Sequence, residues 1–268
     1  MSENMELRSL LEKTLPVVEE AAAFIRSQAG KVTDQEIESK SPNSLVSYVD
    51  KTAETLLVEG LRALLPAAGF ITEEDTVSQS EAAYTWIIDP LDGTTNFLQQ
   101  IPFYAVSVGL AHRGELILGI VCDIEQHEMF YAWKGGGAWC NGKRIQVATR
   151  TNIQDAVVAT GFPYASTDVT PGLMDLFEYF LKNAKGMRRL GSAALDLAYV
   201  ACGRMDIYYE ETLHAWDIAG GMVLVREAGG MVSDYERKPN MLENGQVIAA
   251  NPVLHEAVVR HIQRVFTS

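Results

Sequence analysis

The sequence predicts an α/β protein whose first half packs helices on an antiparallel sheet and whose second half alternates strands with helices. The chain has 268 residues, of which 47% are hydrophobic. That length can bury a core without help from a metal or a disulfide. Apolar residues recur at helical spacing near the N-terminus, and strand-like and helix-like segments alternate beyond about residue 150. At roughly 150 residues per domain, one large domain or two fused subdomains would fit.

Two helices are expected in the first 65 residues. The first runs from Met5 to roughly Ser27, where apolar residues recur at helical spacing. The second follows Asp50, carries leucines on one face and ends before Pro66. Each helix therefore has an apolar stripe that can pack against a sheet.

Strands are expected to fill the rest of the first half. Trp86–Ile88 is expected to be a short buried strand that Asp89-Pro90 stops. Arg113-Gly114 should join two further strands, and Asn141-Gly142 is a strong hairpin signal. The other strands expected here are Tyr104–Ala111, Glu115–Cys122 and Met129–Trp133.

After about Arg150 the pattern changes to alternating strands and helices, which is typical of an α/β layer. The expected strands are Ala156–Thr160, Met205–Tyr209, Met231–Ser233 and Gln246–Ala250, and the expected helices lie near 172–184, 192–202, 217–228 and 252–266. We therefore expect one domain over 1–268, with an α+β subdomain over about 1–150 and an α/β subdomain over 151–268.

The charge of the chain argues against nucleic acid as a partner. Its 22 Lys and Arg residues against 35 Asp and Glu residues give a net charge of −13. Nucleic-acid affinity comes largely from basic residues that displace counterions, so a duplex would be repelled. An acidic protein that handles phosphate would need bound cations to reverse the local sign of charge.

Cysteine usage and the apolar runs indicate the compartment. Cys122, Cys140 and Cys202 are odd in number and widely spaced, which suits a reducing environment better than a disulfide framework. No basic segment followed by an apolar core opens the sequence, and no apolar run approaches the roughly 20 residues that span a bilayer. We expect a soluble, cytoplasmic protein with no membrane partner.

The most informative segment runs from Trp86 to Phe97, where a buried strand leads into Asp89-Pro90-Leu91-Asp92-Gly93-Thr94-Thr95-Asn96. Pro90 restricts the backbone around the two aspartates, and Gly93 lets the chain approach a ligand closely. Hard divalent cations prefer carboxylate and carbonyl oxygens, and two such ions need a carboxylate that bridges them. The simpler alternative is an ordinary Asp-Pro-x-Asp-Gly turn.

Two further acidic segments favour the metal-site interpretation. Glu73-Glu74 follow another short apolar run, although in isolation a charged loop would be the favoured interpretation. Asp217 opens a predicted helix after His214-Ala215-Trp216, where it could simply be the N-cap. We expect His214 to pack near the site rather than to bind metal, because hard Mg²⁺ prefers oxygen.

Taken together, these motifs resemble the inositol monophosphatase family, within the metal-dependent, lithium-sensitive sugar phosphatases. The resemblance covers nearly the whole chain and rests on Glu73-Glu74, Asp89–Phe97, Gly191-Ser192-Ala193-Ala194 and Trp216–Gly220. It implies a layered αβαβα fold and a magnesium-dependent, lithium-sensitive phosphatase that is usually a homodimer.

The resemblance also implies a site with two to three Mg²⁺ ions. Glu73, Asp89 and the Leu91 carbonyl would hold the first ion. Asp89 would bridge to a second ion, which Asp92 and Asp217 would complete. A third, weaker ion would lean on Glu73 and water.

Further roles are implied for the attacking water and the phosphate. Thr94, paired with Asp50, would orient the water, so the implied catalytic residues are Glu73, Thr94 and Asp50. Backbone N–H groups of Gly93 and Thr94 would receive phosphate oxygens. This division of labour suits phosphoryl transfer, in which the protein mainly positions the reacting groups.

Substrate hydroxyls should be bound outside the metal cage. Glu210 matches the family's sugar- or inositol-binding glutamate, and Ala193 matches a backbone contact, so the implied substrate-binding residues are Asp92, Gly93, Thr94, Ala193, Glu210 and Asp217. An exposed acid at a strand end is the simpler explanation of Glu210, since Glu211 is equally acidic.

Two segments depart from the family pattern. Lys40, in Glu38–Pro42, is shifted by one position from the lysine of a mobile loop in many animal members, so a role in closing over the third ion is doubtful. Gly161–Tyr164 resembles bacterial members, and this region shapes the substrate pocket of the family. The preferred substrate therefore cannot be copied from animal enzymes.

The leading hypothesis is hydrolysis of myo-inositol monophosphate to inositol and phosphate. Within the same fold, a fructose-1,6-bisphosphatase or another sugar or nucleotide phosphatase is the alternative. Two other activities of this fold fit the motif less well. After Asp-Gly-Thr, 3′-phosphoadenosine phosphatases usually have Lys-Glu and histidinol-phosphate phosphatases usually have Arg, whereas this chain has Thr95-Asn96. A non-catalytic regulatory scaffold is the alternative of another class, although such a scaffold would be expected to lose at least one of Glu73, Asp89, Asp92, Thr94 and Asp217.

Overall fold

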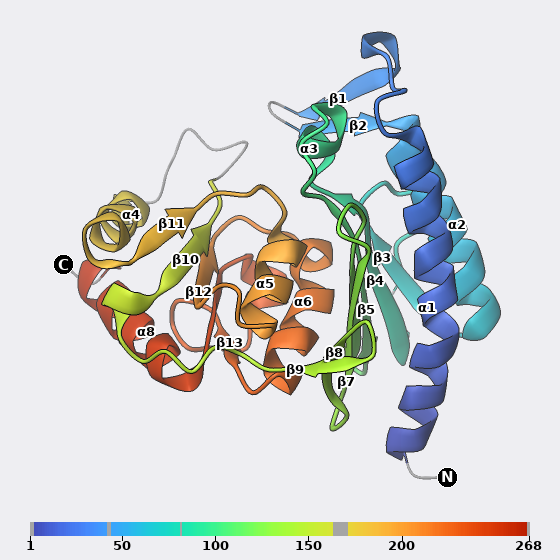
Figure 1. The fold of residues 1–268 in the computed structure, drawn as a ribbon. Helices are drawn as coiled ribbons and strands as arrows, with labels where there is room; N and C mark the ends of the chain where they lie inside the picture. The colour runs from blue at the N-terminus through green and yellow to red at the C-terminus, as the bar shows by residue number, and fades with distance from the viewer. Residues whose placement is uncertain (1–2, 42–43, 81, 163–170, 267–268) are drawn as a thin grey trace.

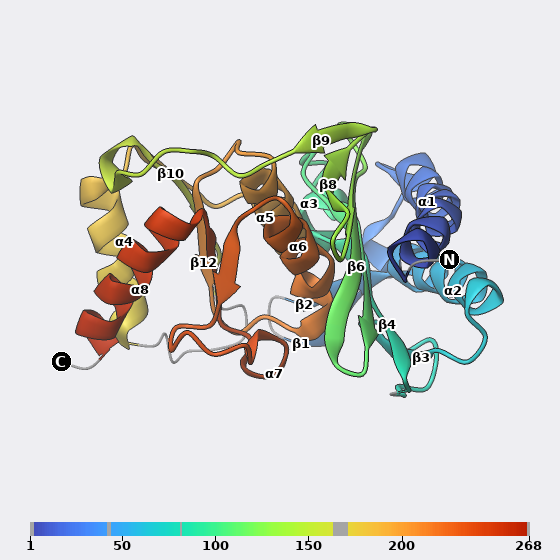
Figure 2. The ribbon, with the colours of Figure 1, turned by 90° about the horizontal axis from the view of Figure 1, so that it is seen from below.

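A computed structural model describes residues 3–41, 44–80, 82–162 and 171–266. Figures 1 and 2 show five layers that alternate helices and sheets. Helices α1 and α2 form one outer layer, a seven-stranded sheet lies beneath them, and α5 and α6 form the central layer. A five-stranded sheet and the outer helices α4 and α8 complete the stack. This αβαβα arrangement confirms the expected fold.

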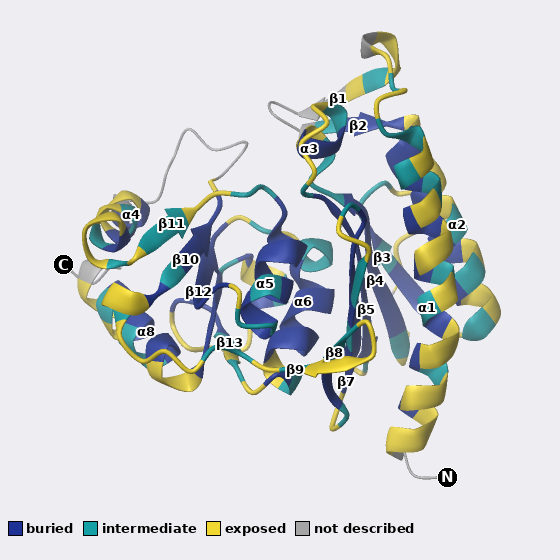
Figure 3. Cartoon of the chain, in the orientation of Figure 1, coloured by how far each residue is buried: buried dark blue, intermediate teal, exposed yellow. Residues whose placement is uncertain are grey.

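Helices α1 (Glu3–Gln28) and α2 (Tyr48–Leu64) cover one face of the larger sheet. Their apolar faces are buried against it, and their polar faces are exposed, as Figure 3 shows. Helix α2 begins before Asp50, contrary to expectation: Ser47 is its N-cap, and Asp50 lies in its first turn. The Asp50 carboxylate accepts hydrogen bonds from the Ser47 amide and hydroxyl, both at 2.8 Å, so it helps to fix the start of the helix.

The seven-stranded sheet has the order β3-β4-β5-β6-β7-β8-β9, and only the β3–β4 pair is parallel. Its strands are β3 (Gly69–Thr72), β4 (Tyr84–Asp92), β5 (Ala105–His112), β6 (Glu115–Asp123), β7 (Glu128–Trp133), β8 (Gly137–Cys140) and β9 (Lys143–Ile145). Arg113-Gly114 and Asn141-Gly142 make the expected two-residue turns, all four with positive φ. Strand β4 does not stop at Asp89-Pro90 as expected but continues to Asp92.

Helices α5 (Ala193–Ala201) and α6 (Ala215–Glu227) lie between the two sheets. Helix α6 approaches the larger sheet so closely that a Cβ on Gly119 would lie only 2.3 Å from the Gly220 carbonyl oxygen. The absence of a side chain at Gly119 permits this contact. The same core cluster includes buried residues of both sheets and of both helices. This close packing fixes where the first turn of α6 meets the end of β4.

The smaller sheet has the order β11-β10-β12-β14-β13 and mixes parallel with antiparallel pairs. Its strands are β10 (Val157–Thr160), β11 (Gly186–Arg188), β12 (Ile207–Glu210), β13 (Met231–Ser233) and β14 (Val247–Ala250). Helices α4 (Pro171–Asn183) and α8 (Pro252–Phe266) cover its outer face. The alternating pattern predicted both of these helices and every strand of this sheet except β11. The subdomain boundary near residue 150 stays a prediction.

The remaining elements are short. They are β1 (Ile37–Ser41), β2 (Ser44–Ser47), α3 (Thr94–Leu98), α7 (Met241–Asn244) and two 3₁₀ turns at Asp34–Glu36 and Ile153–Asp155. Strands β1 and β2 form a separate antiparallel pair. Among the helices that the structure describes, none is long and apolar enough to cross a membrane.

Candidate active site

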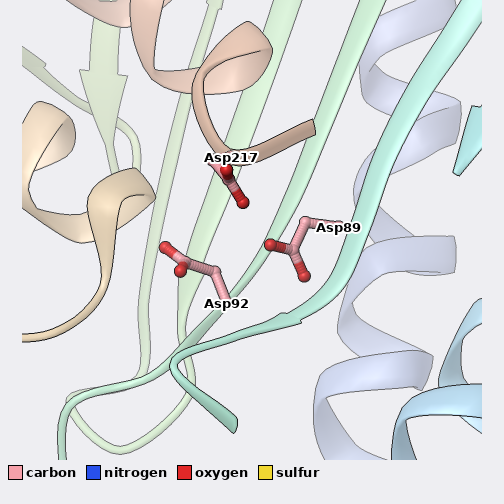
Figure 4. Close-up of side chains that lie close together, drawn as sticks. All are labelled: Asp89, Asp92 and Asp217. Carbon is pink, nitrogen blue, oxygen red and sulfur yellow. The ribbon is translucent and has the colours of Figure 1, made fainter. Parts of the chain in front are cut away.

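Three aspartates converge where the end of β4 meets the first turn of α6. Figure 4 shows the side chains of Asp89 and Asp92 from β4 close to that of Asp217 from α6. One carboxylate oxygen from each lies within 4.8 Å of the other two, which is close enough for shared cations. The structure thus brings together residues 125 positions apart (217 − 92) that sequence reasoning had placed in one site.

An irregularity in β4 puts both of its aspartates on the same side. A regular strand would send residues three positions apart to opposite faces. Here Asp89 pairs with Ser107 and Asp92 with Ala105, so three steps along β4 oppose two along β5. The extra residue is typical of a β-bulge, which redirects side chains. The Leu91 amide then donates to Asp89 Oδ1 at 2.9 Å and holds the turned segment.

One oxygen of Asp92 and one of Asp217 are fixed by the protein. Asp92 Oδ2 accepts from the Ser192 hydroxyl at 2.6 Å and from the Ala194 amide at 2.7 Å, both at the start of α5. Asp217 Oδ2 accepts from the His214 amide at 2.6 Å. The His214 ring itself stacks on Trp216 at a centroid distance of 4.6 Å. Each carboxylate keeps its other oxygen for a ligand in the cluster.

The aspartates carry raised pKa values because negative charge is concentrated in a buried place. Burial raises the pKa of Asp89 well above its usual range, and the charges of Glu73, Asp92 and Asp217 raise it further. Burial likewise raises the pKa of Asp217, and Asp92 adds to the effect. Burial raises the pKa of Asp92 to about 6, although the hydrogen bonds from Ser192 and Ala194 act to lower it. Such an all-oxygen, electron-rich donor set fits hard divalent cations, which would relieve the repulsion.

Glu73 reaches the cluster from the loop that follows β3. Its charge raises the pKa of Asp89, Asp92 and Asp217, which places it beside all three. Glu54 of α2, which is fully buried, holds this loop: it accepts from the Glu74 amide at 2.7 Å and from the Thr76 amide at 2.8 Å. The Thr76 hydroxyl adds a third bond at 2.7 Å. Sequence reasoning missed Glu54, although a charged residue on the apolar face of α2 was a usable signal.

Thr94 and Asp50 form the expected pair beside the cluster. The Thr94 hydroxyl lies 3.0 Å from Asp50 Oδ1 and 3.0 Å from the Leu91 carbonyl oxygen. Burial raises the pKa of Asp50, while the bonds from Ser47 and Thr94 oppose that shift. With Asp50 ionised, it accepts the Thr94 proton and leaves lone pairs of the Thr94 oxygen able to accept from a water.

Gly93 makes the sharp turn between β4 and α3. Its φ of 95° is unfavourable for other residues, and a Cβ there would lie 3.1 Å from the Phe103 carbonyl oxygen. Asn96 ties the same turn to the start of α5, because its side-chain amide donates to the carbonyls of Phe103 at 2.7 Å and Leu190 at 2.8 Å. Gly93 and Asn96 thus fix the Asp89–Phe97 motif against the segment that ends in Gly191-Ser192.

A cavity opens from the aspartates toward β12 and α5. The residues that line it are Asp92, Thr160, Gly161, Arg189, Gly191, Ser192, Ala193, Asp196, Glu210, Leu213 and Asp217. Glu210 is buried and accepts from the Tyr208 hydroxyl at 2.7 Å, so it is not an exposed acid at a strand end. Burial raises the pKa of Glu210 to about 7. Sequence reasoning missed Arg189 and Asp196 on this wall.

The comparison with family models decides the family. The model described as "Inositol monophosphatase family" matches residues 6–266. The chain belongs to the inositol monophosphatase family. The resemblance seen in the motifs is therefore confirmed, and membership supports a phosphatase.

Curated relatives of this family member carry two kinds of name. A protein of Mesorhizobium japonicum named "Inositol-1-monophosphatase" is 38% identical over 261 residues, which cover 97% of this chain and 98% of the relative. A protein of Escherichia coli K12 named "Nus factor SuhB" is 38% identical over 229 residues, which cover 85% of this chain and 86% of the relative.

Solved structures show the same fold. The extragenic suppressor protein suhB of Bartonella henselae matches with a TM-score of 0.90 and 34% identity, covering 95% of this chain and 98% of that one. The IMPase TM1415 of Thermotoga maritima matches with a TM-score of 0.86 and 31% identity, covering 96% and 98%.

Both departures from the family pattern lie partly outside the described residues. Lys40 lies in β1, but its side chain is not described, so its role as a loop lysine stays open. In Gly161–Tyr164, the structure describes Gly161 and Phe162 alone. A Cβ on Gly161 would lie 1.9 Å from Glu210 Oε1, so a larger residue there would displace the Glu210 carboxylate from its present position.

Proposed function

We propose that this protein is a Mg²⁺-dependent phosphomonoesterase that hydrolyses myo-inositol monophosphate to inositol and phosphate. The observation that carries the proposal is the convergence of Asp89, Asp92 and Asp217 within 4.8 Å, with Asp92 and Asp217 on the lining of a cavity. Glu210 and Ala193 line the same cavity, where the remainder of a substrate would lie. Membership of the inositol monophosphatase family and relatives named inositol-1-monophosphatase support the choice of substrate.

The donor set suggests two Mg²⁺ positions and a weaker third. Glu73, Asp89 and the Leu91 carbonyl would hold one ion. Asp89, Asp92 and Asp217 would hold a second, and Glu73 with water a third. When bound, Mg²⁺ supplies charge neutralisation at the phosphoryl oxygens and a lower pKa for water.

The protein's own residues would position the reactants. Thr94, hydrogen-bonded to Asp50, would accept a hydrogen bond from the attacking water and hold the water oxygen in line with phosphorus. The amides of Gly93 and Thr94 would bind phosphate oxygens. Glu210, held by the Tyr208 hydroxyl, would accept substrate hydroxyls. The buried walls of the cavity would limit competing water.

Phosphate release from a small substrate panel tests the proposal. Inositol 1-phosphate should be hydrolysed faster than fructose 1,6-bisphosphate, 3′-phosphoadenosine 5′-phosphate or histidinol phosphate. EDTA should abolish release, and lithium should inhibit it. A Mg²⁺-dependent preference for another compound on the panel would keep the mechanism and replace the substrate. Fructose 1,6-bisphosphate is the first such alternative.

The relatives named Nus factor SuhB support a second candidate function. In that case the scaffold would act as a Nus factor, with or without hydrolysis. Folded protein that releases phosphate from no compound on the panel, with Mg²⁺ present, would favour this function.

We also propose that the protein is a cytoplasmic homodimer. Light scattering can check the oligomeric state, and cell fractionation can check the compartment.

Glu54→Gln should raise the Mg²⁺ concentration needed for half-maximal phosphate release by roughly 10- to 100-fold, as expected when a group that orients a ligand is lost. Both Glu54 oxygens accept from the loop that carries Glu73, and glutamine offers only one acceptor oxygen. Activity should be measured across a Mg²⁺ titration, with the exposed Glu59→Gln on the same helix as control. An unchanged Mg²⁺ requirement, or a loss that excess Mg²⁺ does not restore, would contradict this role.

A further inference from the structure

Asp196 is a buried carboxylate that the fold does not use. It lies on α5 with 1% of its surface exposed and lines the cavity beside the aspartate cluster. Its Oδ1 has no hydrogen-bond partner in the part of the chain that the structure describes. Helix α5 does not need it as a cap, because the Ser192 hydroxyl already accepts from the Leu195 amide. A buried, unpaired carboxylate costs stability, so its place on the cavity wall points to a ligand.

The groups around Asp196 define what that ligand can be. Glu210 of β12, Asp92 of β4 and Arg189 of the segment before α5 line the same cavity. The charges of Glu210 and Asp92 raise the pKa of Asp196, and that of Arg189 lowers it, so all three groups lie near it. Tyr208, whose pKa Asp196 also raises, is engaged with Glu210. On the wall of the cavity, the carboxyl groups of Asp196 and Glu210 thus accompany the guanidinium of Arg189. Carboxylates accept hydrogen bonds from hydroxyls and repel a second phosphate.

We propose that Asp196, together with Glu210, forms a hydroxyl-binding subsite that selects phosphate monoesters of uncharged polyols over bisphosphates. This inference rests on the proposed phosphatase function and specifies the part of the substrate that the metal cluster does not hold. Asp196 is a specificity-determining residue in this assignment. The unpaired Oδ1 finds its partner only when a substrate hydroxyl enters the cavity.

Asp196→Asn tests the assignment because it keeps the shape of the side chain and replaces one oxygen of the carboxyl group with an NH₂ group, which cannot accept a hydrogen bond. At saturating Mg²⁺, kcat/KM for inositol 1-phosphate should fall roughly 10- to 100-fold, the usual effect of losing a hydrogen bond to a charged group. The value for an aryl phosphate without hydroxyls should stay within about twofold. The ratio of inositol 1-phosphate to fructose 1,6-bisphosphate turnover should fall, because a repelling charge is gone.

Thermal melting in EDTA separates this role from a structural one. Asp196→Asn should raise the Tm by about 2–4 °C in a protein of this size, because an unpaired amide costs less than an unpaired carboxylate in a buried place. The matched control is Asp206, equally buried but fully paired: it accepts from Arg150 Nε at 2.7 Å and from the Val157 amide at 2.8 Å. Asp206→Asn should lower the Tm and leave the substrate ratios unchanged.

The possible outcomes are distinguishable. Suppose that the wild type hydrolyses polyol phosphates. If Asp196→Asn then lowers kcat/KM equally for all substrates, or for none, the subsite assignment is wrong and the proposed function stands. A Tm that falls in Asp196→Asn would show a structural role and also overturn the assignment. If the wild type releases phosphate from no compound, the proposed function fails on the wild type alone, and the subsite fails with it.

Discussion

Asp217→Asn is expected to reduce Mg²⁺-dependent phosphate release by on the order of 10²–10³-fold or more while leaving the protein folded. In the wild type, the His214 amide donates to Asp217 Oδ2 at 2.6 Å. The asparagine oxygen can accept the same hydrogen bond, so the start of α6 is preserved. The other position becomes an NH₂ group that faces Asp89 and Asp92. An amide nitrogen that donates hydrogen bonds cannot ligate a hard cation.

Thermal melting gives a readout of the same change without any turnover. Because folding raises the pKa of Asp89 and Asp217, the folded state binds more protons, and stability in EDTA should fall as pH rises from the usual aspartate range through the raised values. Asp217→Asn should weaken that pH dependence and raise the Tm in EDTA near pH 7. Mg²⁺ should raise the Tm of the wild type more than that of the variant.

The control for this variant is Asp175→Asn, an exposed change on α4 in the far outer layer. It should alter neither the rate nor the response of the Tm to Mg²⁺. Wild-type turnover in Asp217→Asn would remove the basis for the metal assignment, whereas equal Tm responses to Mg²⁺ in both proteins would place the ions elsewhere.

The sequence predicted the long elements because their patterns are local. The helical spacing in α1, the turn at Asn141-Gly142 and the alternation after residue 150 each depend on neighbouring residues alone. Strand β4 shows where local rules fail. Pro90 predicts a stop, but it lies in the bulge opposite β5, where a missing amide interrupts no regular pair. The strand therefore continues and carries Asp92 into the cluster.

The start of α2 was misplaced for a related reason. Its cap follows the Ser-x-x-acid arrangement of a capping box, with Asp50 in the place where Glu is usual. Asp50 was expected ahead of the helix, yet its pairing with Thr94 was anticipated from the family resemblance. Position within an element and role in the site are thus separable predictions.

Contacts between distant segments account for the site residues that sequence reasoning missed. Ser192 and Asp92 are 100 positions apart, and only the packing of α5 against the end of β4 brings them into hydrogen bonding. Asp196 and Arg189 line the cavity for the same reason. Asp196 is the one charged residue of α5, whose other members are apolar or aromatic, and this pattern was a usable signal of burial. Its place on the cavity wall appears only in the tertiary fold.

Thr94→Val should lower kcat for inositol 1-phosphate by on the order of 10²–10³-fold, with little change in KM, the Mg²⁺ requirement or the Tm. Valine keeps the shape of threonine and removes the hydroxyl that lies 3.0 Å from both Asp50 Oδ1 and the Leu91 carbonyl oxygen. If that oxygen orients the attacking water, its loss affects the chemical step. Thr94→Ser should retain most of the rate, and steady-state kinetics at saturating Mg²⁺ measure both variants.

The direction of the hydrogen bond between Thr94 and Asp50 matters as much as its presence. Asp50 Oδ2 is committed to the Ser47 amide and hydroxyl, so an asparagine at this position would turn its oxygen toward Ser47 and its NH₂ toward Thr94. The NH₂ would then donate to the Thr94 oxygen and occupy a lone pair that the water needs. Asp50→Asn should therefore reproduce the kcat loss of Thr94→Val, and the double variant should add little to either. Independent, multiplicative losses would instead show that Asp50 acts on the reaction by a route that does not pass through Thr94.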